Sequence, residues 1–125
     1  MLSDSVVIAM IPCRDLDRSR QFYEGQLKLT PREDTPGGIT YVCKGGTLFL
    51  LYPSGLAGSA QTTAMSWVVD DILAEMEELR AQGVVFEEYD MPGLKTVNGV
   101  AEFPGSRSAW FKDPDGNILG VTEVD

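Results

Sequence analysis

The sequence lacks histidine altogether, and its 125 residues include only two cysteines, Cys13 and Cys43. Histidine is the commonest metal ligand in proteins and the side chain that most readily changes charge near neutral pH. Metal centres and acid–base mechanisms that depend on imidazole are therefore excluded, as is a zinc site with four cysteine ligands. The two thiols could pair with each other, but lone thiols in a domain of this size are more typical of reduced cysteines in a cytoplasmic protein.

Basic side chains are also scarce, with ten Lys and Arg against nineteen Asp and Glu and a formal net charge of -9. Nucleic acids and anionic membrane surfaces need clustered Lys and Arg, so neither is an expected partner. No apolar run approaches the roughly 20 residues that cross a bilayer, and the first residues do not resemble a signal peptide. The length fits a single domain over residues 1–125.

The first half of the chain is predicted to contain a strand, a helix and two further strands. Asp15 is placed to cap a helix that begins at Leu16. Lys44-Gly45-Gly46 is typical of a tight hairpin turn and not of a phosphate-binding loop, because no helix follows it. The apolar runs predict strands over residues 6–11, which Pro12 ends, 39–43 and 47–52.

The same order then begins again after a loop over residues 53–63. Asp70 or Asp71 is predicted to cap a helix that runs to about residue 82, where Gly83 stops it. Residues 91–105 are predicted to form a long irregular segment. Asp113-Pro114-Asp115-Gly116 is typical of a type I turn, and it lacks the spacing of a calcium-binding EF-hand loop. Strands are predicted over residues 64–69, 84–89, 108–112 and 117–123.

Local matches indicate an internal duplication. Asp15-Leu16 is repeated as Asp71-Ile72, 56 residues later, and Gly46-Thr47-Leu48 is repeated as Gly116-Asn117-Ile118, 70 residues later. A duplicated strand–helix–strands unit predicts two similar modules.

Three strings in this order resemble the vicinal-oxygen-chelate superfamily of glyoxalases, bleomycin resistance proteins and dioxygenases. The resemblance implies an α+β fold of two βαβββ modules, residues 5–56 and 64–124 with a linker at 57–63, whose curved mixed sheets form a cup. The strings are Arg14 to Ser19 followed by Phe22-Tyr23-Glu24, Val69 to Ile72, and Trp110 to Gly120.

In metal-dependent members of that superfamily, four strand positions project ligands into the cup. The resemblance and the internal repeat both assign these positions to Ile8, Leu50, Ala64 and Gly120. None of these residues has a donor side chain, and hard or borderline cations need oxygen, nitrogen or thiolate ligands. A shift of one residue brings in only Thr63, a weak neutral ligand. No metal and no cofactor are therefore predicted.

The cup that remains is predicted to be mainly apolar, which suits a small organic molecule. Its expected lining follows from alternation along the strands. The apolar members could equally be ordinary core residues, and the two cations, Arg107 and Lys112, could be surface charges. The candidate ligand-binding residues are Ile8, Met10, Leu50, Tyr52, Ser66, Arg107, Ser108, Trp110 and Gly120.

Two functions follow as hypotheses. The first is a metal-independent binding protein, similar to the superfamily members that sequester antibiotics. The second is a metal-free enzyme of the lyase or isomerase type that moves a proton on a small carbonyl or ring substrate, with Glu102, Tyr52 or Lys112 as the catalytic group. In this second hypothesis residues 91–105 form a lid. A glyoxalase- or dioxygenase-like metal enzyme ranks third. The resemblance also implies a homodimer, with modules paired within one chain or exchanged between chains.

Overall fold

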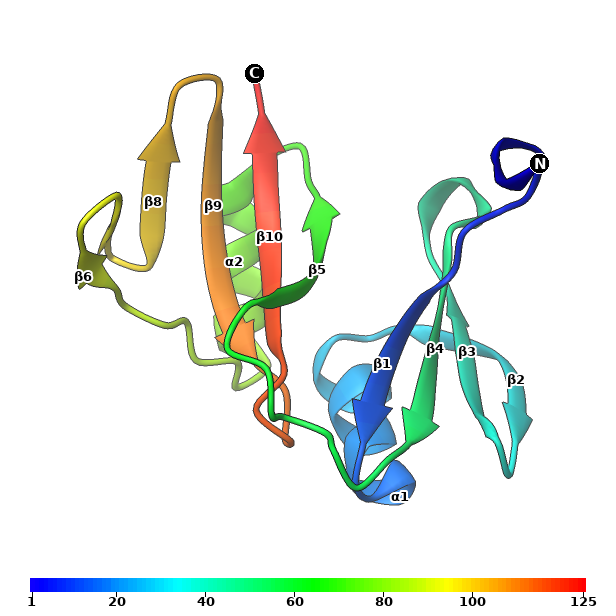
Figure 1. The fold of residues 1–125 in the computed structure, drawn as a ribbon. Coiled ribbons are helices and arrows are strands. Elements are labelled where there is room, and N and C mark those ends of the chain that lie inside the picture. Colours follow the sequence, from blue (N-terminus) through cyan, green and yellow to red (C-terminus); the bar gives the residue numbers. More distant parts are fainter.

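Two β-sheets lie side by side in the computed structural model, which describes residues 1–125 (Figure 1). The first sheet has the strand order β1-β4-β3-β2 and the second has the order β5-β10-β9-β8-β7-β6. The strands are β1 (Ala9–Cys13), β2 (Thr30–Thr35), β3 (Gly38–Val42), β4 (Leu48–Pro53), β5 (Thr63–Val68), β6 (Asp90–Met91), β7 (Leu94–Val97), β8 (Val100–Phe103), β9 (Ser106–Lys112) and β10 (Ile118–Val124). Two mixed sheets with few helices confirm the predicted α+β class.

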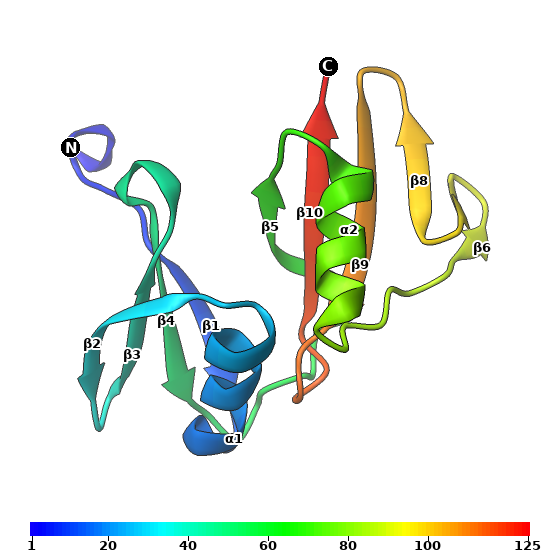
Figure 2. The same ribbon diagram turned by 180° about the vertical axis from the view of Figure 1, so that it is seen from behind.

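Helices cover only one face of each sheet, as the view from behind makes clear (Figure 2). α1 (Leu16–Arg20) continues directly into the π-helical turn η2 (Gln21–Gln26), and α2 (Ile72–Ala81) covers the second sheet. Two short 3-10 turns complete the chain, η1 (Leu2–Asp4) and η3 (Lys44–Gly46). None of these helices is long and apolar enough to cross a membrane.

The internal duplication is present in the strand register. Met10 pairs with Leu50 in the parallel β1–β4 ladder, and their repeat equivalents Ser66 and Gly120 pair in the parallel β5–β10 ladder. The helix caps are duplicated as well. The Asp15 carboxylate accepts a hydrogen bond from the Arg18 N–H at 3.2 Å, and the Asp71 carboxylate accepts one from the Ala74 N–H at 3.2 Å.

Several predicted strands differ from the observed ones. Pro12 does not end the first strand but lies inside β1, which tolerates it because β1 is an edge strand paired only with β4. Residues 84–89 form no strand and make a single bridge, from Phe86 to Phe111. The polar strand β2 was not predicted, because its sequence has no apolar alternation.

The prediction of an irregular lid over residues 91–105 is wrong. These residues form β6, β7 and β8, which extend the second sheet, with a tight turn at Asn98-Gly99 between β7 and β8. Asn98 and Gly99 have φ angles of 52° and 84°, the left-handed conformation that a two-residue hairpin requires. This segment is therefore fixed by strand pairing and does not fold over a cup.

Aromatic rings from both modules form one continuous core. Phe22 of η2 packs against Phe111 of β9, with ring centroids 6.3 Å apart. Trp67 of β5 contacts Phe49 of the first sheet edge-on at 6.2 Å and stacks on Phe111 at 6.4 Å. Trp67 therefore packs on the helix-covered side, and the two modules share one hydrophobic interior.

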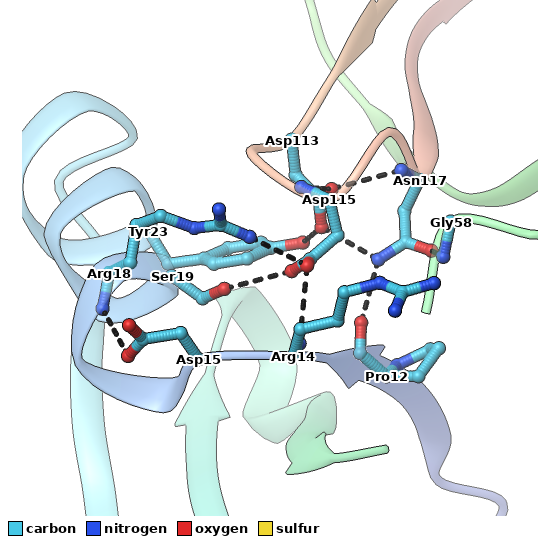
Figure 3. Close-up of polar contacts among 10 residues, drawn as sticks. All are labelled: Pro12, Arg14, Asp15, Arg18, Ser19, Tyr23, Gly58, Asp113, Asp115 and Asn117. Atoms are coloured by element: carbon cyan, nitrogen blue, oxygen red, sulfur yellow. Dashed lines mark hydrogen bonds and ion pairs between the residues drawn. The ribbon is translucent and has the colours of Figure 1, made fainter. Parts of the chain in front are cut away.

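The turn between β9 and β10 also ties the second module to the first through polar contacts (Figure 3). The Asp115 side chain is completely buried and accepts hydrogen bonds from three donors of the first module. These donors are the Arg14 backbone N–H at 3.1 Å, the Arg18 guanidinium at 2.7 Å and the Ser19 hydroxyl at 3.1 Å. A buried carboxylate needs such partners because burying an unpaired charge is costly.

Asp113 and Asn117 add a second layer to this inter-module contact (Figure 3). The Tyr23 hydroxyl donates to Asp113 Oδ2 at 2.8 Å, and the Asn117 amide donates to the same oxygen at 2.8 Å and to the Pro12 carbonyl at 2.7 Å. The Gly116 N–H donates to the Asp113 carbonyl at 3.0 Å and closes the predicted turn. These carboxylates bind donors within the chain, in agreement with the interpretation of this sequence as a turn and not a calcium loop.

The linker over residues 57–63 is held by the same turn. Ala57 is 2 % exposed, and the Gly58 N–H donates to Asn117 Oδ1 at 3.2 Å. Gly58 has a φ of 77°, and a Cβ at this position would lie 1.8 Å from the Asp115 carbonyl oxygen. Only glycine fits here, and this contact sets the path of the chain into β5.

Candidate functional site

Each sheet has one face without a helix, and both of these open faces point to the same side of the molecule (Figures 1 and 2). Alternation along the strands decides which side chains they carry. Most of the residues predicted to line the cup are on these faces. The site therefore consists of two open halves, one on each module.

On the second module, Gly120 marks the centre of the open face. Gly120 pairs with Ser66 on β5 and with Trp110 on β9. A Cβ at Gly120 would lie 3.1 Å from Ser66 Oγ and 3.3 Å from Trp110 Cδ1. The absence of a side chain at Gly120 therefore lets a hydroxyl and an indole ring approach the backbone closely.

Hydroxyl groups form a row beside Gly120. The Thr122 hydroxyl lies 3.1 Å from that of Ser66 and 2.9 Å from that of Ser108. Each hydroxyl can donate or accept, so the row can adjust its hydrogen bonds to a polar group on a ligand. Thr122, which connects the other two, was not among the candidate ligand-binding residues.

Beside the row, the second module has a hollow of about 720 Å³ whose wall includes Trp110 and Tyr89. Their rings meet edge to face at 5.7 Å, and the Trp110 indole N–H donates to the Thr63 hydroxyl at 3.1 Å. Burial raises the pKa of Tyr89, so its phenol stays neutral at physiological pH. The other lining residues are Met91, Leu94, Lys112, Gly116 and Ile118, together with Gly58, Ala60, Gln61, Thr62 and Thr63.

On the first module, the candidate residues of the open face carry hydrocarbon and one phenol, beside Thr40, which pairs with Leu50, and Glu33, which pairs with Thr40. Ile8 and Met10 are 42 % and 54 % exposed, and Leu50 and Tyr52 are half-buried. Leu50 pairs directly with Met10. These four candidate residues are mainly apolar and partly exposed, and none of them lines the hollow of the second module.

Comparisons with known proteins agree with this arrangement. Residues 5–121 match the family model described as the glyoxalase/bleomycin resistance protein/dioxygenase superfamily. The chain belongs to this superfamily. The match spans both modules, so the resemblance seen in the three strings of sequence is confirmed, and no protein with a curated description matches the chain.

Solved structures of the superfamily share the fold at low sequence identity. The antibiotic-binding protein TnmS3 from Streptomyces sp. CB03234 is 24 % identical, with 97 % of this chain and 98 % of that chain covered and a TM-score of 0.73. A glyoxalase/bleomycin resistance protein from the same strain is also 24 % identical, with 94 % and 98 % covered and a TM-score of 0.68. A superfamily member from Alicyclobacillus acidocaldarius is 18 % identical, with 97 % and 92 % covered and a TM-score of 0.70.

The four residues that the resemblance assigns to the superfamily's metal-ligand positions do not fit a metal ion. Ile8 and Leu50 present hydrocarbon, and Ala64 and Gly120 present a methyl group and no side chain. No group of three or more Cys, Asp or Glu side chains in the structure is placed to hold a metal ion. No mechanistic step through a metal can be derived for these residues.

The three charged candidates are not brought together. Lys112 lines the hollow, and its ammonium lies 3.2 Å from the Glu87 carboxylate. Arg107 and Glu102 face the helix-covered side of the second sheet, where the Arg107 guanidinium donates to Glu123 at 2.8 Å. Of the three catalytic candidates, only Lys112 lines the hollow that contains Trp110.

Tyr89, Met91 and Leu94 line the hollow but were not predicted as site residues. Tyr89 was assigned to the end of a strand, and the other two to an irregular segment. The Asn98-Gly99 turn was the available signal, because it predicts a hairpin that brings β7 into the second sheet.

Proposed function

We propose that this superfamily member binds a small organic molecule without a metal ion. The observation that carries the proposal is the hollow of about 720 Å³ lined by Trp110 and Tyr89, in a protein whose metal-ligand positions carry no donor atoms. Apolar and aromatic walls supply affinity, and a few polar groups fix orientation. Lys112 in the hollow and the row of hydroxyls beside it are such polar groups, and TnmS3, which shares the fold, is an antibiotic-binding protein.

The proposal is tested by titrating the purified chain with a panel of aromatic antibiotics while tryptophan fluorescence is followed. The protein has two tryptophans, so a Trp67→Phe chain reports on Trp110 alone. We expect saturable quenching of Trp110, unchanged by EDTA, and full recovery of the unmodified compound. An absence of saturable binding across the panel contradicts the binding function, and a stoichiometric transition metal contradicts its metal independence. A converted compound favours the enzyme hypothesis, with Lys112 as the first residue to substitute.

A substitution at Gly120 tests the same binding proposal at a single position. We expect Gly120→Val to lower ligand affinity at least about tenfold, because its side chain displaces the Ser66 hydroxyl and the Trp110 ring on the open face. Gly25→Val is the matched control, since a Cβ at Gly25 meets nothing within 4 Å. Thermal melting checks that both variants fold. Equal affinity of Gly120→Val and the unmodified chain places the ligand elsewhere.

We further propose that two copies of the chain complete the cup. Both open faces point to one side (Figure 1), so a twofold axis parallel to the strands places the first module of each copy over the second module of its partner. The exposed Met10, at 54 %, and Val68, at 75 %, are then covered. Two free thiols, Cys13 and Cys43, are consistent with action in the reducing cytoplasm.

Sedimentation of the unmodified chain tests this assembly. We expect a dimer that Met10→Glu converts to a monomer, because the substitution places a charge in the apolar interface. Leu73→Glu is the control, since Leu73 is similarly exposed, at 57 %, but lies on α2 and away from the open faces. A monomer at all concentrations, or a dimer that only Leu73→Glu disrupts, contradicts the proposed arrangement.

A further inference from the structure

A second hollow lies on the helix-covered side of the sheets, away from the site proposed above. Its volume is about 140 Å³, and eight of its nine lining residues are hydrophobic. The core rings of Trp67 and Phe111, whose planes are within 12° of parallel, belong to its lining. An apolar cavity of about 150 Å³ is large enough to bind benzene, so this hollow has the size of one six-membered ring.

The backbone between η2 and β2 forms one wall of this hollow. The Leu27 N–H donates to the Phe22 carbonyl at 3.0 Å, and the Leu29 N–H donates to the Tyr23 carbonyl at 3.0 Å. Between them Lys28 has a φ of 61°, a left-handed conformation that ends the helix. As a result, Leu27 and Leu29 both line the hollow.

Glu75 is the only charged residue that lines the hollow. It lies on α2 next to Leu79, is half-buried, and takes part in none of the six ion pairs of the chain. An unpaired carboxylate at an apolar wall favours a cation over a neutral or anionic group. The net charge of -9 adds a long-range attraction for cations.

We propose that this hollow binds a small apolar amine, with a single ring against Trp67 and Phe111 and a protonated amino group beside Glu75. The site is independent of the hollow at Trp110, because the two share no lining residue. Its ligand class also differs, since Glu75 selects for positive charge.

The experiment follows the two indole N–H signals by NMR, assigned with Trp67→Phe and Trp110→Phe, during titration with benzylamine, benzyl alcohol and benzoate. We expect the Trp67 signal of the full chain to shift saturably with benzylamine while the Trp110 signal stays in place. We expect benzylamine to bind about threefold more tightly than benzyl alcohol, the size of a partly exposed ion pair, and benzoate to bind more weakly than either.

A matched pair of variants on α2 assigns this preference to one carboxylate. Glu75→Gln is expected to bind benzylamine and benzyl alcohol equally, whereas Glu77→Gln, an exposed residue that does not line the hollow, keeps the preference. A Trp67 signal that never moves, a shift confined to Trp110, or a preference that survives in Glu75→Gln overturns the proposal. None of these outcomes bears on antibiotic binding at Trp110, which is measured separately.

Discussion

At the scale of single residues, Tyr23 combines complete burial with a polar hydroxyl that needs a hydrogen-bond partner. It is completely buried, and its hydroxyl donates to Asp113 at 2.8 Å. Burial, together with the negative charge of Asp113, raises the pKa of Tyr23 far above its usual value. The pKa of Tyr41 is raised as well, by burial and by its hydrogen bond to Glu24. Both phenols therefore stay protonated in the folded chain.

This predicts a loss of stability at alkaline pH. An unfolded tyrosine ionises near a pKa of about 10, while the folded one keeps its proton, so the folded state is favoured below about pH 10 and progressively less above it. We expect the free energy of unfolding to fall by about 1.4 kcal/mol per pH unit for each such tyrosine. Urea unfolding from about pH 8 to about pH 11 measures the slope. Tyr23→Phe should make it shallower, and an unchanged slope contradicts the assignment.

At the scale of elements, the two helix caps show how local sequence sets structure. Asp15 and Asp71 are repeat equivalents, and each accepts a hydrogen bond from the backbone three residues later. We expect Asp15→Ala and Asp71→Ala each to lower the free energy of unfolding by about 1 kcal/mol. Urea denaturation measures the change, and Asp70→Ala serves as the control beside the second cap. If Asp70→Ala lowers the free energy of unfolding more than Asp71→Ala does, the cap of the second helix is Asp70 and not Asp71.

The strands were less predictable than the helices, for an equally physical reason. β4, β5, β9 and β10 are apolar enough to be found by periodicity, but β2 is almost wholly exposed and polar. β2 pairs with β3 at the edge of the first sheet. The side chains of β2 do not alternate between apolar and polar, so they do not predict this pairing. The segment at 84–89 has the opposite character, since its apolar residues Val84 and Phe86 are buried against the core without entering a sheet.

At the scale of the whole molecule, the relation between the modules depends on Asp115. Its buried carboxylate takes hydrogen bonds from Arg14, Arg18 and Ser19, about a hundred residues away in sequence. We expect Asp115→Asn to lower the free energy of unfolding by about 2 to 3 kcal/mol, because the amide cannot accept from all three donors. Asp90→Asn is the control, since Asp90 is exposed and forms no ion pair. Chemical denaturation in a Trp110→Phe background, followed by Trp67 fluorescence, reports on the interface, and equal stability of the two variants rules out this role.

The sequence by itself determined what depends on near neighbours and on residue chemistry. It specified the helix starts, the turn at Asp113 to Gly116, the duplication, and the absence of donor atoms at Ile8, Leu50, Ala64 and Gly120. Each of these is a property of a few adjacent residues or of a side chain's own atoms, so it follows from the sequence without knowledge of the fold.

Only the tertiary structure decided which face a side chain occupies and what meets it there. Arg107 and Glu102 turned to the helix-covered side because strand pairing fixes the alternation of β8 and β9. The same pairing gathered Tyr89 and Trp110 around one hollow. Contacts of this kind join residues that are distant in the chain, and their energies depend on the packing of both modules together, which local patterns do not encode.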